Sequence, residues 1–316
     1  MKRVVVTGPT GVIGTALIKR LAEKDIDVYA VCRPSSNRIQ NIMKHNKVHV
    51  IKCDLETLDI LPSLIGNECD VFFHLAWVGT LNPQNRFDMY LQNENVRYSL
   101  DAVKAAHNLK CKVFVGAGSQ AEYGRMSGIM RPDTYPNPVS GYGMAKLCAG
   151  QMTRYMCKQY GIRHVWPRIL SVYGTGDGEQ TFISSAMRTL LSGEKFSMTL
   201  GEQIWDYLYS SDAADALIAM SEKGKDGSVY VLGSGMAMKL RQYVEIIRNT
   251  INPELEIGFG DIPYNEDQVM YMKADIRAIV EDTGWHPRIS FEEGVKCVIR
   301  EIETRNTESS DIRNDD

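Results

Sequence analysis

The stretch VVVTGPTGVIG at residues 4–14 decides the fold of this chain. Its three valines predict a short buried strand, and residues 14–24 predict a helix with apolar side chains at helical spacing. Between them, Gly8, Gly11 and Gly14 stand at a GxxGxxG spacing, which gives a tight turn, access of a phosphate to the backbone and close helix packing. The helix N-terminus then offers free N–H groups to an anion. The segment predicts a dinucleotide-binding turn, but glycines also simply end strands, so the motif is weak alone.

Outward from this turn, strand-like runs alternate with helical patterns. The apolar runs lie at residues 3–7, 27–32, 48–53, 71–75, 112–115 and 164–170, and the helical patterns include 14–24 and 96–108. Short apolar strands that alternate with helices are typical of a parallel sheet covered on both faces. We therefore predict the α/β class, with a doubly wound parallel sheet of the Rossmann type.

The rhythm changes after about residue 175, where glycines become frequent. Helical patterns follow at 183–192, 213–223 and 240–250, separated by short strands. We predict a dinucleotide-binding domain over residues 1–174 with later elements interleaved at about 203–222, and a smaller α/β substrate domain mainly over 175–303. The polar tail at 304–316 is predicted to be disordered.

Composition excludes several classes of protein. The formal net charge is −3, with lysines and arginines spread along the chain, which argues against a nucleic-acid or membrane partner. No apolar run approaches the ~18 residues of a membrane span, and the run in MKRVVVTG is too short for a signal peptide. The seven cysteines form no CxxC pair and the six histidines no HxxxH pair. We expect a reduced, cytoplasmic protein with no metal site.

The end of the second strand, CRPSSNR at residues 32–38, bears on the choice of cofactor. A site that prefers NAD usually places Asp or Glu here, on the ribose 2′-hydroxyl. This segment has no acid, whereas Arg33 and Arg38 can bind a 2′-phosphate through charge-assisted hydrogen bonds. We favour NADP over NAD; in the alternative, Arg33 stacks on adenine or is solvated. Asp54 is a candidate for the adenine amine or for a helix N-cap before Leu55.

Tyr142 and Lys146 are four residues apart in SGYGMAKLCAG, so on a helix they share one face. That pairing suits hydride-transfer chemistry, because a tyrosine must exchange a proton with the reacting oxygen and its unperturbed pKa is about 10. A neighbouring ammonium favours the phenolate and lowers that pKa. The lysine can also hold the nicotinamide ribose. The alternative is an amphipathic surface pair.

Ser119 lies in the polar turn after the fifth strand, in VFVGAGSQAEYG. The carboxyl ends of strands face the ligand crevice in a doubly wound sheet. Ser119 is therefore placed to hydrogen-bond the same substrate oxygen as Tyr142, unless it is an ordinary turn serine.

The chain resembles the extended short-chain dehydrogenases/reductases of the NAD-dependent epimerase/dehydratase family, whose members modify nucleotide sugars. The matching segments run in family order over roughly residues 3–300: TGPTGVIG (7–14), CDL (53–55), HLA (74–76), GSQAEYG (118–124), YGMAK (142–146), RILSVYG (168–174), WDYLYSSD (205–212) and GWHP (284–287). Any one of these segments is weak, but the ordered set is specific.

The resemblance implies that Ser119, Tyr142 and Lys146 are the catalytic residues. It implies cofactor contacts from Gly8, Thr10, Gly11, Val12, Ile13, Gly14, Arg33, Asp54, Leu55, Leu75, Ala76, Tyr142, Lys146, Pro167 and Ile169. It also implies a nucleotide-sugar substrate and a homodimer formed through two helices of each subunit, one of them bearing Tyr142 and Lys146.

Departures from the family pattern limit this interpretation. The 4,6-dehydratases carry an Asp-Glu pair where this chain has Gln120 and Ala121, which argues against a dehydratase. Glu122 is still present, and three alternative roles are open to it: contact with the sugar, supply of a proton, or capping of the turn. Ser171 stands where the family usually has an asparagine, and Trp205 stands where it usually has an arginine that contacts the diphosphate. The two alternatives for Trp205 are stacking on a base or sugar and packing in the small domain. Gln120, Glu122, Ser171 and Trp205 are the predicted substrate contacts.

Three functions are weighed. The first is an NADPH-dependent reductase of a nucleotide-linked 4-keto-(6-deoxy)hexose, favoured by the basic segment at 32–38 and by the missing dehydratase acids. The second is a C4 epimerase that retains NAD, which the same three catalytic residues would serve. The third is a non-catalytic NAD(P)-binding sensor, disfavoured because Tyr142 and Lys146 are both present.

Overall fold

The computed structural model describes residues 1–80, 82–266 and 268–314, with side chains described as far as Thr304. Within these residues, an eight-stranded sheet has the order β13-β8-β5-β4-β1-β2-β3, with β6 paired to β8 beside this path. Its strands are β1 (Arg3–Thr7), β2 (Asp27–Cys32), β3 (Val48–Lys52), β4 (Val71–His74), β5 (Val113–Gly116), β6 (Gly118–Ser119), β8 (Arg163–Ile169) and β13 (Ser228–Leu232). All of these pairings are parallel. The predicted doubly wound sheet is confirmed, and strand order reverses between β1 and β4, where such sheets bind ligands.

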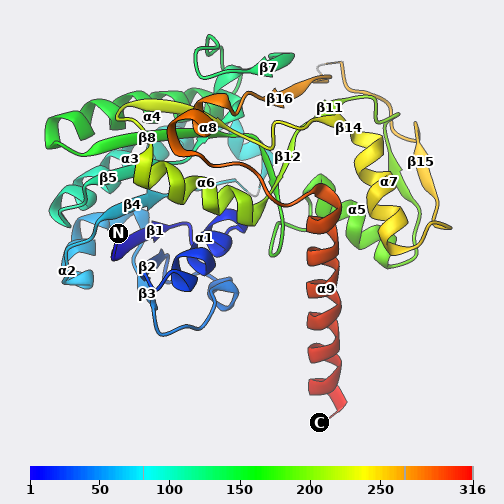
Figure 1. The fold of residues 1–316 in the computed structure, drawn as a ribbon, viewed down its shortest axis with the longest axis horizontal. Helices are drawn as coiled ribbons and strands as arrows, with labels where there is room; N and C mark the ends of the chain where they lie inside the picture. Colours follow the sequence, from blue (N-terminus) through cyan, green and yellow to red (C-terminus); the bar gives the residue numbers. More distant parts are fainter. Residues whose placement is uncertain (81, 267, 315–316) are drawn as a thin grey trace.

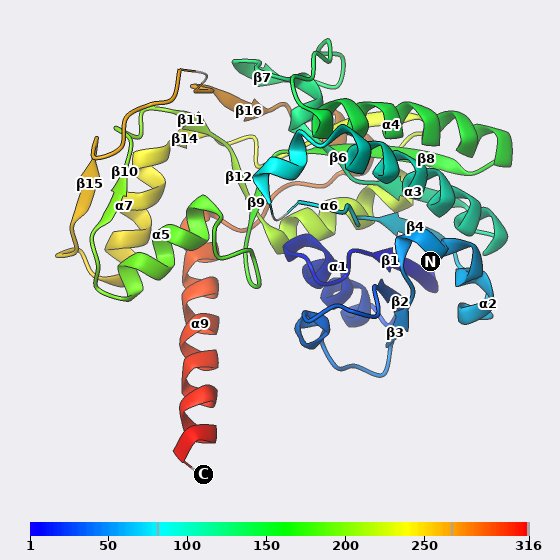
Figure 2. The same cartoon turned by 180° about the vertical axis from the view of Figure 1, so that it is seen from behind.

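Helices cover both faces of the sheet (Figures 1 and 2). One face packs against α1 (Val12–Glu23), α6 (Ser210–Lys223) and α8 (Arg277–Thr283), and the other against α2 (Leu61–Ile65), α3 (Met89–Asn108) and α4 (Gly141–Tyr160). The valines of β1 divide between the two cores: Val4 and Val6 lie on the α1 side, and Val5 lies on the α3 side. Alternate strand residues point to opposite faces, so a strand buried on both sides must be apolar throughout.

In the part of the chain that the structure describes, four short 3₁₀ helices follow the carboxyl ends of strands. They are η1 (Ile39–Asn41), η2 (Leu55–Ile60), η3 (Pro83–Arg86) and η4 (Gln120–Tyr123).

The second half of the chain returns to the sheet more than the sequence suggests. Besides α6, the strand β13 pairs with β8, and α8 packs with α6 and β13. The interleaved part therefore extends well past the predicted 203–222, because the free edge of β8 carries backbone N–H and C=O groups that pair with a further strand.

A separate core lies beyond this sheet. It is formed by α5 (Phe182–Leu191), α7 (Leu240–Ile251) and α9 (Phe291–Asn314). Paired short strands accompany it: β10 (Phe196–Met198) with β15 (Ile257–Phe259), β11 (Ile204–Trp205) with β14 (Met238–Lys239), and β9 (Ser171–Tyr173) with β12 (Tyr207–Tyr209). A further pair, β7 (Gly128–Met130) with β16 (Met272–Ala274), packs in another cluster with Leu170 and Val231. This core agrees with a smaller substrate domain; the exact domain boundaries stay a prediction.

The long helix α9 projects away from the rest of the molecule in both views (Figures 1 and 2). Its backbone continues to Asn314, through most of the tail that the sequence predicts to be disordered. Residues 315–316 lie outside the described residues, and disorder of the tail stays a prediction. Across the described ranges, no helix is both long and apolar enough to cross a membrane.

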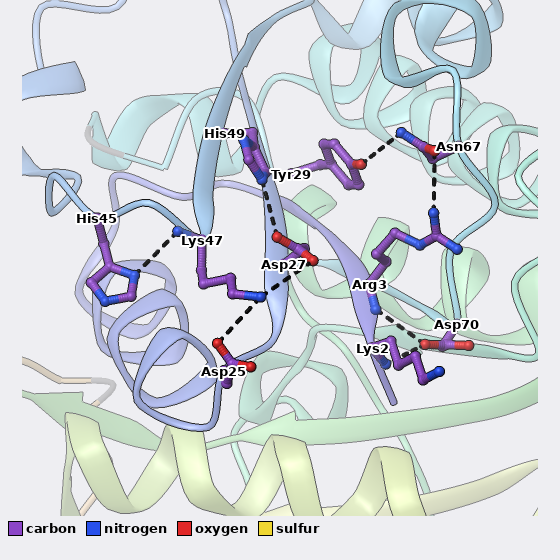
Figure 3. Close-up of polar contacts among 10 residues, drawn as sticks. All are labelled: Lys2, Arg3, Asp25, Asp27, Tyr29, His45, Lys47, His49, Asn67 and Asp70. Carbon is purple, nitrogen blue, oxygen red and sulfur yellow. Dashed lines mark hydrogen bonds and ion pairs between the residues drawn. The ribbon is translucent and has the colours of Figure 1, made fainter.

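Polar contacts join the amino ends of β1–β4, at the edge opposite the site (Figure 3). The backbone N–H of Arg3 donates to Asp70 at 3.1 Å, and its guanidinium donates to Asn67 at 3.2 Å. Lys47 lies 3.8 Å from the carboxylate of Asp27. Partly exposed pairs of this kind each contribute little to stability. These contacts join the amino ends of the strands, and the polar loops of the site lie at the opposite, carboxyl edge of the sheet.

The glycines of the first turn are required by space and by backbone conformation. Gly8 has φ +72°, and a Cβ there would lie 2.8 Å from the backbone nitrogen of Ala76. A Cβ on Gly14 would lie 2.2 Å from the carbonyl oxygen of Gly8, so only glycine lets α1 pack this closely on β1. The expected roles of tight turn and close packing are thus confirmed for these two positions.

We predict that Gly14→Ala destabilises the protein by about 3 kcal/mol, because the new methyl group must push α1 off the turn. Gly11→Ala is the matched control: its Cβ would meet nothing closer than 3.7 Å. The control should stay within about 1 kcal/mol of the wild type, since only the N-cap preference for glycine is lost. Urea unfolding measures both, and equal stability of the two variants would contradict the packing argument.

Candidate active site

A groove of about 490 Å³ opens at the carboxyl ends of β1 to β4. It is lined by eight of the residues predicted to contact a cofactor, namely Gly8, Thr10, Gly11, Arg33, Asp54, Leu55, Leu75 and Ala76. The remaining predicted contacts do not line it: Val12, Ile13 and Gly14 lie in the first turn of α1, Tyr142 and Lys146 in α4, and Pro167 and Ile169 in β8.

The N-terminus of α1 borders this groove. Gly11 is the N-cap residue, and no side chain caps the first turn. The first N–H groups of a helix have no partner within the helix. They are therefore available to an anionic group such as a pyrophosphate.

Two arginines from the segment after β2 line the groove, at the end where the sequence predicts the adenosine of the cofactor. Arg33 is exposed, whereas Arg38 is half-buried and donates to the carbonyl oxygen of Gly176 at 3.3 Å. Asp54 occupies the N-cap position of η2, but its side chain makes no capping hydrogen bond. The capping alternative for Asp54 is therefore not what the structure shows, and its carboxylate lines the groove.

Ser119, Tyr142 and Lys146 converge beside the groove, as the sequence predicts. Tyr142 and Lys146 occupy successive turns of α4, with the Lys146 Nζ 5.8 Å from the centroid of the Tyr142 ring. The ammonium donates to the carbonyl oxygen of Ala117 at 2.7 Å. Ser119 ends β6, and its side chain lies close enough to the phenol of Tyr142 to act on the pKa of that group. A hydroxyl, a phenol and an ammonium thus share one small volume, which is the geometry that proton transfer to a reacting oxygen requires.

Burial dominates the electrostatics of these groups. Burial raises the pKa of Tyr142, while Ser119 and the charge of Arg86 act to lower it. The lower pKa expected from a neighbouring ammonium is therefore not what the structure of the free enzyme shows. Burial lowers the pKa of Lys146 to about 7, against the opposing effect of the Glu122 carboxylate. An ammonium that titrates near neutrality is typical of catalytic sites.

Glu122 corrects one prediction. The residue is fully buried, and its carboxylate accepts from Arg168 at 2.7 Å, from Trp166 at 3.0 Å and from the backbone of Ser119 at 2.9 Å. It forms a capping box with Ser119, so the turn-capping alternative is confirmed. Contact with a substrate would require this ion pair to open, and so the predicted contact with the sugar is not supported. Its place is beneath Ser119, not in the groove.

The other predicted substrate contacts lie in two places. Gln120 follows Ser119 at the start of η4 and is half-buried. Ser171 and Trp205 come together, since the indole N–H donates to the hydroxyl of Ser171 at 2.8 Å. Trp205 also packs against the core of the small domain, as the second alternative for it expected. Their contacts with a substrate stay predictions.

His74 is a core residue. It is 3% exposed, and its two ring nitrogens lie 3.0 Å from the hydroxyl of Thr7 and 3.3 Å from that of Ser99. Burial and the charge of Lys146 lower the pKa of His74 to about 3, so the ring is neutral at physiological pH. It supports the site from within the sheet.

Sequence reasoning missed Trp77 and Arg86. The Trp77 ring centroid lies 3.7 Å from the Lys146 Nζ, and the Arg86 guanidinium lies 5.1 Å from the centroid of the Tyr142 ring. The signal for Trp77 was its position, directly after the HLA segment whose Leu75 and Ala76 line the groove. Arg86 comes from η3, and nothing in its local pattern points to Tyr142. Among the described residues, no group of three or more His, Cys, Asp or Glu side chains is placed to hold a metal ion.

A groove at the carboxyl edge of a doubly wound sheet, with the half-buried Tyr142 and the buried Lys146 and Ser119 beside it, is typical of enzymes that bind a dinucleotide. The model of the NAD dependent epimerase/dehydratase family matches residues 4–233. The chain belongs to this NAD-dependent epimerase/dehydratase family, and the prediction of an enzyme of the extended short-chain dehydrogenase/reductase type is confirmed.

Relatives of several activities resemble the chain over nearly its whole length. A putative UDP-glucose 4-epimerase of Methanocaldococcus jannaschii is 26% identical, over 96% of this chain and 99% of its own. The dTDP-4-dehydro-6-deoxyglucose reductase of Escherichia coli is 24% identical, over 95% and 97%. The solved structure of UDP-glucose 4-epimerase from Thermotoga maritima with UDP-glucose has a TM-score of 0.85 and 23% identity, over 96% and 99%. The last likeness shows the fold alone.

We predict that Glu122→Gln lowers the free energy of unfolding by about 3–5 kcal/mol, because it leaves the buried charge of Arg168 without a partner. The double variant Glu122→Gln with Arg168→Met should recover most of that stability, since neither buried charge remains. Chemical denaturation of the three proteins measures the effect. A single variant as stable as the wild type would contradict the assignment of a buried ion pair.

Proposed function

We propose that this enzyme reduces a nucleotide-linked 4-keto-(6-deoxy)hexose with NADPH. The observation that carries the proposal is the convergence of Ser119, Tyr142 and Lys146 beside a groove with two arginines at its far end. Gln120 and Ala121 stand where the dehydratases of the resembled family carry an acid pair, so elimination chemistry lacks its groups. Similarity to the Escherichia coli reductase is in keeping with the proposal.

The residues of the chain divide the work of such a reduction. The N-terminus of α1 would hold the pyrophosphate, Arg33 and Arg38 would hold the 2′-phosphate, and Lys146 would hold the nicotinamide ribose. When bound, NADPH supplies the hydride that reduces C4. Tyr142 then donates its proton to the C4 oxygen, and Ser119 orients that oxygen with a hydrogen bond. The charge of Lys146 stabilises the phenolate that remains.

A C4 epimerase that retains NAD is the second candidate. Similarity to the Methanocaldococcus relative favours it, at an identity as high as that of the reductase. Both reactions use the same three residues, so the bound cofactor separates them. NAD that remains stoichiometric through purification would support the epimerase and contradict the reductase.

The proposed reaction is tested with purified enzyme, NADPH and a panel of nucleotide-linked 4-keto-6-deoxyhexoses. Oxidation of NADPH that depends on the keto-sugar, with a C4 alcohol as product by NMR, supports the proposal. Interconversion of C4 epimers without net oxidation supports the second candidate. Cofactor binding with no turnover of any of these sugars favours the non-catalytic sensor.

Tyr142→Phe is expected to lower kcat about 10²–10⁴-fold, because the reacting oxygen loses its proton donor. The affinity for cofactor should change less than about threefold, which fluorescence titration with NADPH measures. Tyr155→Phe is the matched control, since this tyrosine is 67% exposed farther along α4 and should keep full activity. Full activity of Tyr142→Phe would contradict the proton-donor role.

The double variant Arg33→Ala with Arg38→Ala is expected to weaken NADPH binding at least about tenfold, because charge-assisted hydrogen bonds to a 2′-phosphate are lost. NADH binding should stay within about twofold. Arg97→Ala serves as the control, since Arg97 pairs with Glu94 on the surface of α3. An equal loss for both dinucleotides would contradict the preference for NADP.

The homodimer and the cytoplasmic location remain proposals. The outward face of α4 exposes Met144 and Met152, 46% and 44% of their surface, which is in keeping with a helix that pairs with a second subunit. Leu147 and Met156 on the same helix are half-buried, and Met156 packs against the core of its own subunit.

A further inference from the structure

Trp77 contacts both groups that the proposed function assigns to proton transfer. Its half-buried indole lines the cofactor groove directly after β4. The face of the ring lies against Lys146, with Nζ 3.7 Å from the ring centroid. The same indole meets Tyr142 at 87°, edge to face, with centroids 5.9 Å apart.

Buried amides fix the orientation of this indole. Its N–H donates to the side-chain oxygen of Gln92 at 2.9 Å, and the amide nitrogen of Gln92 donates to the carbonyl oxygen of Asn85 at 2.7 Å. Asn95 bonds both the N–H and the carbonyl of Val78, at 2.7 and 3.1 Å. Gln92 and Asn95 are 2% and 1% exposed, so a displaced indole would leave a buried polar group without its partner. The ring is therefore held on Lys146.

The Lys146 ammonium has few stabilising neighbours in its buried position. Tyr142 lies one turn away on α4 and Glu122 lies in η4, but that carboxylate is already paired with a buried guanidinium. His74 in β4 is neutral, and Arg86 in η3 is a like charge at the Tyr142 ring. Burial lowers the pKa of Lys146 to about 7. Among the described residues, the carbonyl of Ala117 and the indole face of Trp77 lie nearest to the charge, and the Tyr142 ring lies farther off.

We propose that Trp77 is a positioning residue that holds the Lys146 ammonium on its indole face and so keeps it charged beside Tyr142. A cation over an aromatic face is stabilised by the quadrupole of the ring, most strongly for tryptophan and in desolvated sites. Loss of the face disfavours the charged form, so the pKa of Lys146 falls and the ammonium is lost at a lower pH. The inference rests on the proposed function in taking Lys146 and Tyr142 as the reacting pair.

The test is an NMR titration of the full-length enzyme labelled with ¹³C at the lysine ε-carbon. The Lys146 resonance is assigned by its absence from Lys146→Met. Trp77→Leu is expected to titrate about one pH unit below the wild type, from the usual strength of such a contact. Trp77→Phe is the matched control: it keeps an aromatic face and should recover most of that difference. A Trp77→Leu midpoint equal to that of the wild type, or a shift as large in Trp77→Phe, overturns the proposal.

Gln92→Met tests the same contact without a change to the indole, and it decides the matter if Trp77→Leu does not fold. Without its acceptor, the indole ring is free to leave Lys146. The pH midpoint of the Lys146 titration should then fall by at least about half of the one-unit fall expected for Trp77→Leu. An unchanged midpoint in Gln92→Met, with Trp77→Leu unfolded, overturns the proposal.

A kinetic readout accompanies the titration. In Trp77→Leu, the decline of kcat/KM with rising pH should begin about one pH unit lower than in the wild type. The titration uses the free enzyme without substrate, so its outcome is independent of the reaction. Failure of the proposed function would instead appear as wild-type enzyme with a normal Lys146 titration and no turnover of keto-sugars.

Discussion

The site depends on one constraint, which is that an ammonium must stay charged inside the protein. Lys146 is 4% exposed, and burial disfavours its charged form. A hydrogen bond to Ala117 and the face of Trp77 stabilise it, and Glu122 adds a favourable field from below. Because its pKa lies near neutrality, small changes in these neighbours alter its charge at physiological pH. In the proposed reaction, this charge stabilises the phenolate that Tyr142 becomes when it gives up its proton.

The buried pair of Glu122 and Arg168 has a different task from the one its sequence position suggested. A carboxylate with no exposed surface and three hydrogen-bond partners is poorly suited to proton exchange with a substrate. It is well suited to hold the backbone of Ser119, which it bonds directly. The hydroxyl of Ser119 thereby acquires a fixed position beside Tyr142. Rigid support beneath a site of this kind favours preorganised hydrogen bonding to a reacting oxygen.

The cofactor groove shows how the parallel sheet brings distant segments together. Strand ends separated by dozens of residues in sequence meet at one edge, where glycine turns and polar loops replace the apolar strands. The amino ends are joined by ion pairs and hydrogen bonds at the opposite edge (Figure 3). The sheet is thus stabilised on its faces and at one edge, and the other edge is free to vary with the ligand.

By itself, the sequence determined the fold class and the place of the groove at the carboxyl ends of the strands. The GxxGxxG turn, the apolar strands and the i, i+4 spacing of Tyr142 and Lys146 are local patterns, and local sterics and helical periodicity suffice to interpret them. Only the tertiary structure decided that Glu122 lies under the site, that Trp77 covers Lys146 and that β13 and α8 return to the sheet. Each of these depends on a contact between residues far apart in the chain. Such contacts are selected by packing and by the partners available to a buried charge, which no local pattern records.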